Sequence, residues 1–283
     1  MKDSTLILVE SNKNSARVIL NRPDRRNAFD ARMVKELCDV FTLLSQDSSL
    51  RAITLAGNGA VFCAGADINW LASESAVSAA QAREDAEQLA RMFRTIDECP
   101  CPVIGQIQGP AFGGGVGLVA ACDIAVAAKD ATFALSEVRL GMVAGVIAPL
   151  LLRKTGDSFL RRFCLTGEVF SAAAAKQYNL VHDVVEKDQL GSRVVELVHA
   201  VSNLAPQAVR DTKALIRRLR AVPDGGRWNA GIEANAYARL SVEAQEGFRA
   251  FLERRSPVWT TGSGSQGKKS SIKGPYDVAE RKA

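Results

Sequence analysis

Residues 102–127 read PVIGQIQGPAFGGGVGLVAACDIAVA, and this stretch decides the fold class. Pro102–Gln106 has the composition of a buried strand, and three consecutive glycines at Gly113–Gly115 open a short helix. A second strand is expected at Ile124–Ala127. Because a strand, a helix and another strand in this order form a parallel βαβ unit, the stretch predicts an α/β core.

The flanking sequence continues this alternation toward the N-terminus and becomes helical toward the C-terminus. Asp30 is placed to cap a helix whose predicted apolar face is Met33, Leu37, Val40, Phe41 and Leu44. The other early elements expected are strands at Thr5–Glu10, Ala16–Leu20 and Arg51–Ala56 and a helix at Ala76–Asp97. The helices expected after Pro149 are Ser171–Tyr178, Gly191–Leu204, Pro206–Ala221 and Glu233–Arg255.

The composition of the 283 residues, 47% hydrophobic and 24% charged, excludes a disordered chain. Length alone suggests about two domains. No apolar run reaches the roughly 18 residues that span a bilayer, so we expect no membrane insertion. The formal net charge is +5, but Thr260–Ala283 holds five basic and two acidic residues, so the remaining chain is weakly basic. This distribution argues against an extended nucleic-acid surface.

The six cysteines and two histidines offer little for metal or thiol chemistry. Cys99-Pro100-Cys101 lacks the two-residue spacing of zinc or thioredoxin motifs, so we expect free thiols in a reducing compartment and no metal site. His182 and His199 are expected to be structural. The N-terminal residues show neither a signal peptide nor an arginine-rich transit pattern, which predicts a cytoplasmic location and leaves a mitochondrial one open.

Two glycine-containing turns are candidates for binding a negatively charged oxygen. Val61–Ile68 reads VFCAGADI, in which small residues leave N–H groups accessible and Asp67 can cap a helix. At Gly113–Gly115 a ligand can approach the chain closely, and the first helical turn has free N–H groups. Taken alone, the first turn is better explained as a tight turn with a helix cap, and the second is equally explained by packing. Two N–H groups that converge on one oxygen form an oxyanion hole, so the two turns together favour a site for a polarised carbonyl.

Glu137 is the candidate for proton transfer. It follows the strand-like run Ala131–Leu135 in largely apolar surroundings, which raise the pKa of a carboxyl and suit a general acid or base. The alternative is an exposed acid paired with Arg139. The sequence contains no Gly-x-Ser-x-Gly motif, which argues against a serine hydrolase.

Six separated motifs together resemble the enoyl-CoA hydratase/isomerase (crotonase) family over residues 5–259. They are Asn21-Arg22-Pro23 with Arg26-Asn27-Ala28, Phe62–Asp67, Gly113–Gly115, Ala121–Asp123, Ser136–Gly141 and the helical segment Glu246–Arg255. The resemblance implies a single catalytic domain in place of the two suggested by length. It is an α/β, crotonase-like spiral of ββα units in residues 1–200, with a C-terminal helical trimerisation layer of the same domain in residues 201–259. Residues 260–283 are expected to form a mobile basic tail.

The resemblance also implies a substrate and the residues that bind it. The substrate is an acyl-CoA, whose thioester oxygen would accept hydrogen bonds from the N–H groups of Ala66 and Gly114 while Glu137 acts as acid and base. The residues implied in CoA binding are Ala28, Ala64, Ala66, Ile68, Gly114, Phe251 and Arg254, the last two reaching the CoA of the same or a neighbouring subunit. No metal or separate cofactor is implied, and the expected assembly is a homotrimer or a homohexamer of two trimers.

Position 117 departs from the family pattern, because two-acid hydratases carry a glutamate two residues after the triple glycine and this chain has Gly117. A single carboxyl suits either hydration of the 2,3 double bond or a double-bond shift, and a non-catalytic relative that binds acyl-CoA or RNA is the third alternative. Gly117 with Ser136–Gly141 is similar to methylglutaconyl-CoA and isohexenylglutaconyl-CoA hydratases, which implies a branched, carboxylated substrate. Unlike those proteins, the chain has no proline near Ala144.

Overall fold

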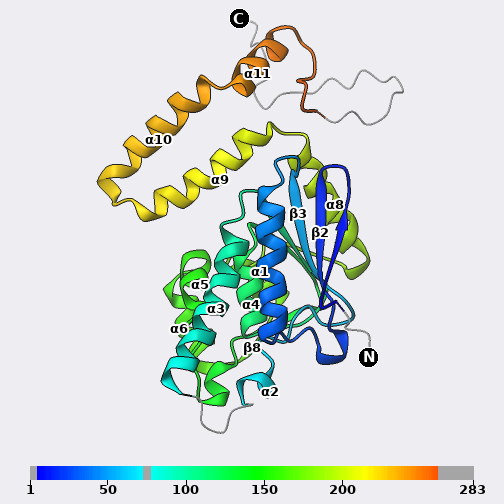
Figure 1. Cartoon of the computed structure of the whole chain (residues 1–283), viewed down its shortest axis with the longest axis vertical. Helices are drawn as coiled ribbons and strands as arrows, with labels where there is room; N and C mark the ends of the chain where they lie inside the picture. Colours follow the sequence, from blue (N-terminus) through cyan, green and yellow to red (C-terminus); the bar gives the residue numbers. More distant parts are fainter. Residues whose placement is uncertain (1–4, 73–77, 261–283) are drawn as a thin grey trace, which may run out of the picture.

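A six-stranded sheet lies at the centre of the computed structural model, which describes residues 5–72 and 78–260 of the chain (Figure 1). The strand order is β1-β2-β3-β4-β6-β9, in which β1 and β2 form an antiparallel hairpin and every other neighbouring pair is parallel. The bounds are β1 (Ile7–Ser11), β2 (Ser15–Leu20), β3 (Ala52–Gly57), β4 (Val103–Ile107), β6 (Ile124–Ala128) and β9 (Asp183–Val185). The parallel α/β core predicted from residues 102–127 is therefore present.

A smaller sheet of three strands follows the order β5-β7-β8. Its members are β5 (Ala111–Phe112), β7 (Thr132–Ala134) and β8 (Val169–Ser171). The chain passes from a strand of the large sheet to one of the small sheet and then into a helix, as in β4, β5 and α4 (Gly114–Ala121). This repeated ββα path brings the triple glycine to the junction between the two sheets.

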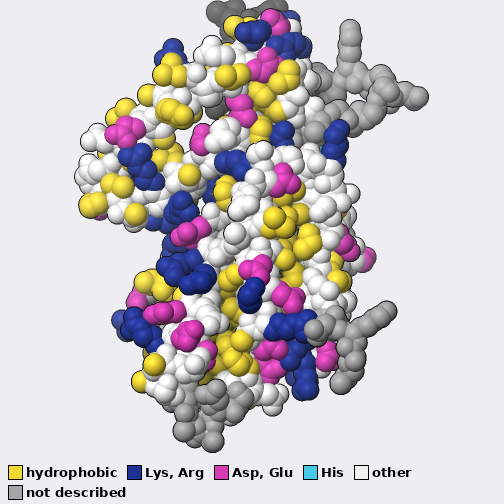
Figure 2. Space-filling view, in the orientation of Figure 1, with side chains coloured by type: hydrophobic (Ala, Val, Ile, Leu, Met, Phe, Trp, Pro, Cys, Tyr) yellow, Lys and Arg dark blue, Asp and Glu magenta, His cyan; other side chains and the backbone are white. Residues whose placement is uncertain are grey.

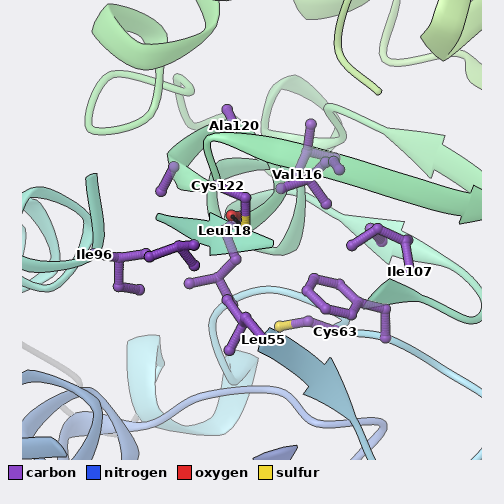
Figure 3. Packing of buried hydrophobic residues seen from close by; sticks show 14 of the residues in the cluster. Leu55, Cys63, Ile96, Ile107, Val116, Leu118, Ala120 and Cys122 are labelled. Atoms are coloured by element: carbon purple, nitrogen blue, oxygen red, sulfur yellow. Dashed lines mark hydrogen bonds between the residues drawn. The ribbon is translucent and has the colours of Figure 1, made fainter. Parts of the chain in front are cut away.

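Three helices cover one face of the large sheet: α1 (Ala31–Gln46), α3 (Ala79–Asp97) and α4 (Figure 1). The predicted cap of α1 is confirmed, since the Asp30 carboxylate accepts a hydrogen bond from the Met33 N–H at 2.9 Å. α4 is buried along almost its whole length, as expected of a helix without a polar face. Val116 and Leu118 belong to the same buried cluster as Leu55 of the sheet and Ile96 of α3, and Figure 3 shows Leu118 above Leu55.

The opposite face of the large sheet is covered by α8 (Leu190–Ser202). A second apolar cluster forms there, in which Leu190 and Val194 pack against Ala52, Ile104 and Val126. The strands are thus buried on both faces, which explains why their sequences read as nearly continuous apolar runs. The remaining short elements are η1 (Pro23–Arg25), α2 (Ile68–Leu71), η2 (Glu137–Leu140), α5 (Ala148–Thr155), α6 (Asp157–Thr166), α7 (Ala172–Gln177) and η3 (Lys187–Gln189).

The C-terminal helices extend away from the sheets as an arm made of α9 (Pro206–Ala221), α10 (Asp224–Arg239) and α11 (Val242–Leu252) (Figure 1). The expectation of a single helix at Glu233–Arg255 is wrong. Helix α10 already begins at Asp224 and ends at Arg239, and a new helix, α11, begins at Val242. The Ser241 hydroxyl caps that helix by accepting a hydrogen bond from the Ala244 N–H at 3.0 Å. Figure 2 shows hydrophobic side chains exposed along this arm.

Other boundaries differ by a few residues from the expected ones. The helix expected from Ala76 begins at Ala79, where the Ser78 hydroxyl accepts a hydrogen bond from the Gln81 N–H at 3.1 Å. Two short strands, β8 and β9, occur in the C-terminal half, where strand signals are weak. The tail expected at residues 260–283 lies outside the described residues apart from Thr260.

An aromatic cluster joins the small sheet to helices α6 and α7. The Phe163 ring centroid lies 4.3 Å from that of Phe170 and 4.8 Å from that of Phe159. Phe133 of β7 and Tyr178 complete the cluster, at 5.6 Å from Phe170 and 5.5 Å from Phe159. These contacts hold β7, which leads directly into Glu137.

We expect Phe159→Ala to lower the free energy of unfolding by about 3–5 kcal/mol, because it removes a fully buried ring from a packed cluster. Urea denaturation followed by circular dichroism measures the change. Leu165→Ala on the same helix is the matched control, since Leu165 is 73% exposed and should change stability by less than about 0.5 kcal/mol. Equal losses in the two variants would contradict the packing described here.

Candidate active site

A cavity of about 350 Å³ opens between the two glycine-containing turns, α3 and the segment that follows β7. Most of its surface is apolar, from residues such as Leu89, Phe93 and Ile147. The predicted site residues among its lining are Ala28, Ala64, Ala66, Ile68, Gly114 and Glu137. The structure therefore brings together residues that are more than a hundred positions apart in the sequence.

The two glycine-containing turns lie side by side. The Phe112 N–H donates to the Cys63 carbonyl at 2.9 Å, which ties the turns together, and the Phe29 N–H donates to the Gly65 carbonyl at 2.9 Å. Gly65 has φ +90°, and a Cβ there would lie 2.7 Å from the Phe112 carbonyl oxygen and 3.1 Å from the Gly114 nitrogen. Only glycine fits this position, because both the left-handed backbone and the contact exclude a side chain.

The N–H groups of Ala66 and Gly114 are available to a ligand. Neither donates a hydrogen bond to any residue in the described ranges, although the N–H groups of Phe29, Asp67 and Gly113 beside them do. Gly114 begins α4, so the partial positive charge of the helix N-terminus adds to its N–H. A Cβ on Gly114 would lie 2.4 Å from Cζ of Phe29, so the close packing here requires a glycine. This arrangement can stabilise a negative charge on a carbonyl oxygen.

A buried polar network holds the loop that carries Ala28 and the turn that carries Ala66. The Asn27 side chain is fully buried and donates to the Asn58 and Val61 carbonyls at 2.8 Å each. The Arg22 guanidinium donates to the Ala28 carbonyl at 2.9 Å and pairs with Asp67 at 2.9 Å.

Asp67 is ionised and fixed in this network. Burial raises its pKa, but hydrogen bonds from Asn69 and the Arg22 guanidinium outweigh burial and hold the pKa below its usual value. Arg22 and Asn27 belong to motifs that carried the family resemblance, yet sequence reasoning gave them no role. The sequence signals that could have found them are an arginine directly before Pro23 and an asparagine a few residues after it.

Glu137 lies against the backbone beside Gly114. The Gly113 N–H donates to the Ala134 carbonyl at 2.8 Å, which holds β7 against the glycine turn two residues before Ser136. A Cβ on Gly113 would lie 3.3 Å from Oε1 of Glu137. The other carboxyl oxygen, Oε2, is buried without a hydrogen-bond partner among the described residues.

Burial raises the pKa of Glu137 above its usual value. The alternative in which Glu137 is an exposed acid paired with Arg139 is wrong, since the structure records no ion pair between them and the Arg139 side chain lies against Gly167. A half-buried carboxyl with a raised pKa, next to free N–H groups, can move protons near neutral pH.

Position 117 faces an apolar wall. A Cβ on Gly117 would lie 2.4 Å from Cγ2 of Ile147 and 2.9 Å from Cε1 of Phe93. The space that a second acid would need is therefore filled by an aliphatic and an aromatic side chain. Glu137 is the one carboxyl in the described lining that no cation neutralises, because Asp67 is paired with Arg22.

Phe251 and Arg254 do not reach this cavity within one chain. Both lie at or just after α11, at the far end of the arm from α2 (Figure 1). Phe251 is 83% exposed, and Arg254 has a left-handed backbone with φ +54°. Their contact with CoA, which would then come from a neighbouring subunit, stays a prediction.

The histidines and cysteines expected to be structural lie outside the cavity lining. His182 Nδ1 accepts a hydrogen bond from the Ala125 N–H at 3.0 Å, and burial lowers its pKa. All six cysteines are free, and burial raises the pKa of Cys63, Cys101 and Cys122 to about 12. Within residues 5–72 and 78–260, no three His, Cys, Asp or Glu side chains gather as a metal site requires.

The sequence profile of the enoyl-CoA hydratase/isomerase family matches residues 10–262. The chain belongs to this family. Its spiral of two sheets and helices is the crotonase fold, as the resemblance implied. In the described part of this family member, no helix has the length and apolar character that crossing a bilayer requires.

Proteins similar to this chain are named for different activities. The crystal structure of an enoyl-CoA hydratase from Shewanella pealeana has a TM-score of 0.86 and 36% identity, covering 91% of this chain and 97% of that one. Mevalonyl-coenzyme A hydratase sidH of Aspergillus fumigatus is 34% identical over 245 residues, 85% of this chain and 89% of that protein. The peroxisomal Delta(3,5)-Delta(2,4)-dienoyl-CoA isomerase of Arabidopsis thaliana is 31% identical over 266 residues, 89% of this chain and 96% of that protein. Family membership therefore leaves hydration and isomerisation both open.

We expect Gly117→Ala to destabilise the protein by about 1–3 kcal/mol, because its Cβ would overlap Ile147 and Phe93 in a packed core. Gly191→Ala, in α8, is the control, since a Cβ there meets nothing within 4 Å and should stabilise the helix by about 0.4–1 kcal/mol. Thermal unfolding monitored by circular dichroism gives both values. Equal changes of stability in the two variants would show that Ile147 and Phe93 do not fill the space beside position 117.

Glu137→Gln should stabilise the protein relative to wild type, increasingly so as pH rises. The folded-state pKa of Glu137 is raised, so its contribution to stability is complete below the unfolded-state pKa and is lost as pH rises through the folded-state value. Glutamine does not ionise and avoids that loss. Urea denaturation of both proteins from acidic to neutral pH measures the difference, and a pH-independent difference would contradict the raised pKa.

Proposed function

We propose that this family member is an enoyl-CoA hydratase that adds water reversibly across the 2,3 double bond of its substrate. One observation carries the proposal: two free N–H groups and one unpaired carboxyl line the same apolar cavity. The N–H groups of Ala66 and Gly114 bind the thioester oxygen, and Glu137 is the catalytic acid and base.

The reaction proceeds through an enolate. The Glu137 carboxylate accepts a proton from water while the water oxygen forms a bond to C3 of the enoyl group. The π electrons of the double bond move toward the thioester oxygen, whose negative charge the two N–H groups stabilise. The Glu137 carboxylic acid then returns a proton to C2, the enolate collapses, and the carboxylate is regenerated. One water molecule is added, and no separate cofactor takes part in the proposed reaction.

The cavity lining also offers backbone groups that could bind the CoA portion of the substrate. The Ala64 carbonyl and the Ile68 N–H make no hydrogen bond to a described residue, and both residues line the cavity together with Ala28. An adenine ring presents donors and acceptors on one edge, which an exposed carbonyl and an exposed N–H can match. We propose that the adenine of CoA binds here.

The acyl group faces an apolar surface formed by Leu89, Phe93, Met142, Val146 and Ile147. A branched aliphatic acyl group suits such a wall. For the distal carboxylate of a methylglutaconyl-like substrate, Arg25 is the one basic residue in the described lining. A carboxylated acyl group therefore stays a proposal that depends on Arg25.

A second candidate function is isomerisation of a 3-enoyl-CoA to the 2-enoyl isomer. The wall at Gly117 favours it, because a single carboxyl can carry a proton between two carbons of one enolate without a second acid. The oxyanion hole would be the same. The two functions differ only in whether water enters the site.

We propose that copies of this chain associate through the arm formed by α9, α10 and α11. Trp228, Leu240, Val242 and Leu252 are each at least 80% exposed in the single chain, more apolar surface than a monomer usually leaves uncovered (Figure 2). A homotrimer or a hexamer of two trimers would cover it. A cytoplasmic location also stays a proposal, since one relative is named as peroxisomal.

A substrate panel tests the function: crotonyl-CoA, 3-methylglutaconyl-CoA and a 3-enoyl-CoA, with loss or gain of conjugated thioester absorbance as the readout. We expect the 2-enoyl substrates to be hydrated and Glu137→Gln to lower kcat by at least about a hundredfold, since it removes the acid and base. Glu87→Gln, on the exposed face of α3, is the control for loss of a glutamate elsewhere.

Isomerisation of the 3-enoyl substrate without hydration of either 2-enoyl substrate would contradict the hydratase function and support the isomerase function. Near-wild-type turnover of Glu137→Gln would remove Glu137 from the mechanism.

A further inference from the structure

Ser136 is the residue immediately before Glu137, and its side chain is the one hydroxyl in the described lining of the cavity. It is half-buried and occupies the N-cap position of η2. Serine at such a position ordinarily accepts a hydrogen bond from the following turn. Here the Ser136 side chain makes no capping hydrogen bond, so its hydroxyl is not engaged by the following turn.

Hydration needs more than a base, because the attacking water must present a lone pair toward C3. A single hydrogen bond to Glu137 leaves the water free to rotate, and a second acceptor would fix it. In a two-acid site the other acid can supply that contact. In this chain Ile147 and Phe93 occupy the corresponding space beside Gly117 and offer no polar atom.

The polar side chains in the described lining are Arg25, Asp67, Ser136 and Glu137. Asp67 is paired with Arg22 and accepts the Asn69 N–H at 2.9 Å, and the Arg25 guanidinium cannot accept a hydrogen bond. Among these side chains, Ser136 therefore supplies the acceptor next to Glu137 in the chain.

We infer that Ser136 is a positioning residue that holds the attacking water for Glu137, an inference that rests on the hydratase function proposed above. The water donates one hydrogen bond to the Glu137 carboxylate and one to the Ser136 hydroxyl oxygen, both of which belong to residues that line the cavity. The proton on the first bond moves to Glu137 as the water oxygen bonds to C3. Ser136 keeps its own proton throughout and forms no bond to substrate.

The proposed role of Ser136 distinguishes two reactions of the site, water addition and proton exchange at C2. Water addition requires both Ser136 and Glu137. Exchange of a proton at C2 of a saturated acyl-CoA requires Glu137 and the oxyanion hole, but no nucleophilic water. Removing the Ser136 hydroxyl should therefore affect the first process and spare the second.

The test compares Ser136→Ala, Ser136→Thr and the wild-type protein in hydration of crotonyl-CoA and in exchange of the C2 protons of butyryl-CoA in D2O, followed by mass spectrometry. We expect Ser136→Ala to lower kcat by about tenfold, the value of one hydrogen bond, with KM changed by less than about twofold. Ser136→Thr, which keeps a hydroxyl, should recover most of kcat. Ser192→Ala, an exposed serine on α8, is the matched control.

The pH profile and the exchange rate distinguish water positioning from a displaced Glu137. Both should be unchanged in Ser136→Ala, because the carboxyl and its surroundings are intact. Equal loss of hydration and exchange, or a kcat that Ser136→Ala leaves untouched, overturns the inference while the hydratase function stands. A wild-type protein that hydrates no enoyl-CoA overturns both together.

Discussion

The contact between two backbone turns that are distant in the sequence is the constraint on which this site depends. Gly65 packs so tightly against Phe112 and Gly114 that a Cβ would lie 2.7 Å from a carbonyl oxygen. The close packing of the two turns sets the distance between the Ala66 N–H and the Gly114 N–H. Hydrogen bonds from Phe29 and Phe112 fix the turns without using either of these N–H groups. The backbone is thus rigid where its donors are unsatisfied, which is the requirement for stabilising a developing charge.

The position of Glu137 follows from packing rather than from polar contacts. The aromatic cluster around Phe163 holds the small sheet, and the Gly113 N–H fixes the end of β7. The carboxyl is consequently held in an apolar setting that opposes its ionisation. Burying an acid without a partner destabilises the fold, and the core supplies the stability that offsets it. The same burial that weakens the fold gives Glu137 a pKa suited to proton transfer.

Much of this architecture could be predicted from the sequence because the decisive signals are local. Glycine runs, the Asp30 cap and buried strands depend on neighbouring residues, and the structure has them where they were expected. The break between α10 and α11 was missed, since no glycine or proline stands at Leu240 and only Ser241 marks the new start. The wall at Gly117 could not be predicted, because Phe93 and Ile147 come from distant segments that meet only in the folded chain. The boundary expected at residue 200 stays a prediction.

The wall beside Gly117 also bears on how activities in such a scaffold change during evolution. A glutamate at 117 would collide with Ile147 and Phe93, so it cannot be accommodated by one substitution alone. Smaller residues at 93 or 147 would first open a cavity in the core, which lowers stability before any acid is gained. Intermediates on either path are therefore less stable than the present protein. One-carboxyl and two-carboxyl sites are thus separated by a loss of stability, whereas substitutions in the acyl-facing loops carry no such cost to the packed core.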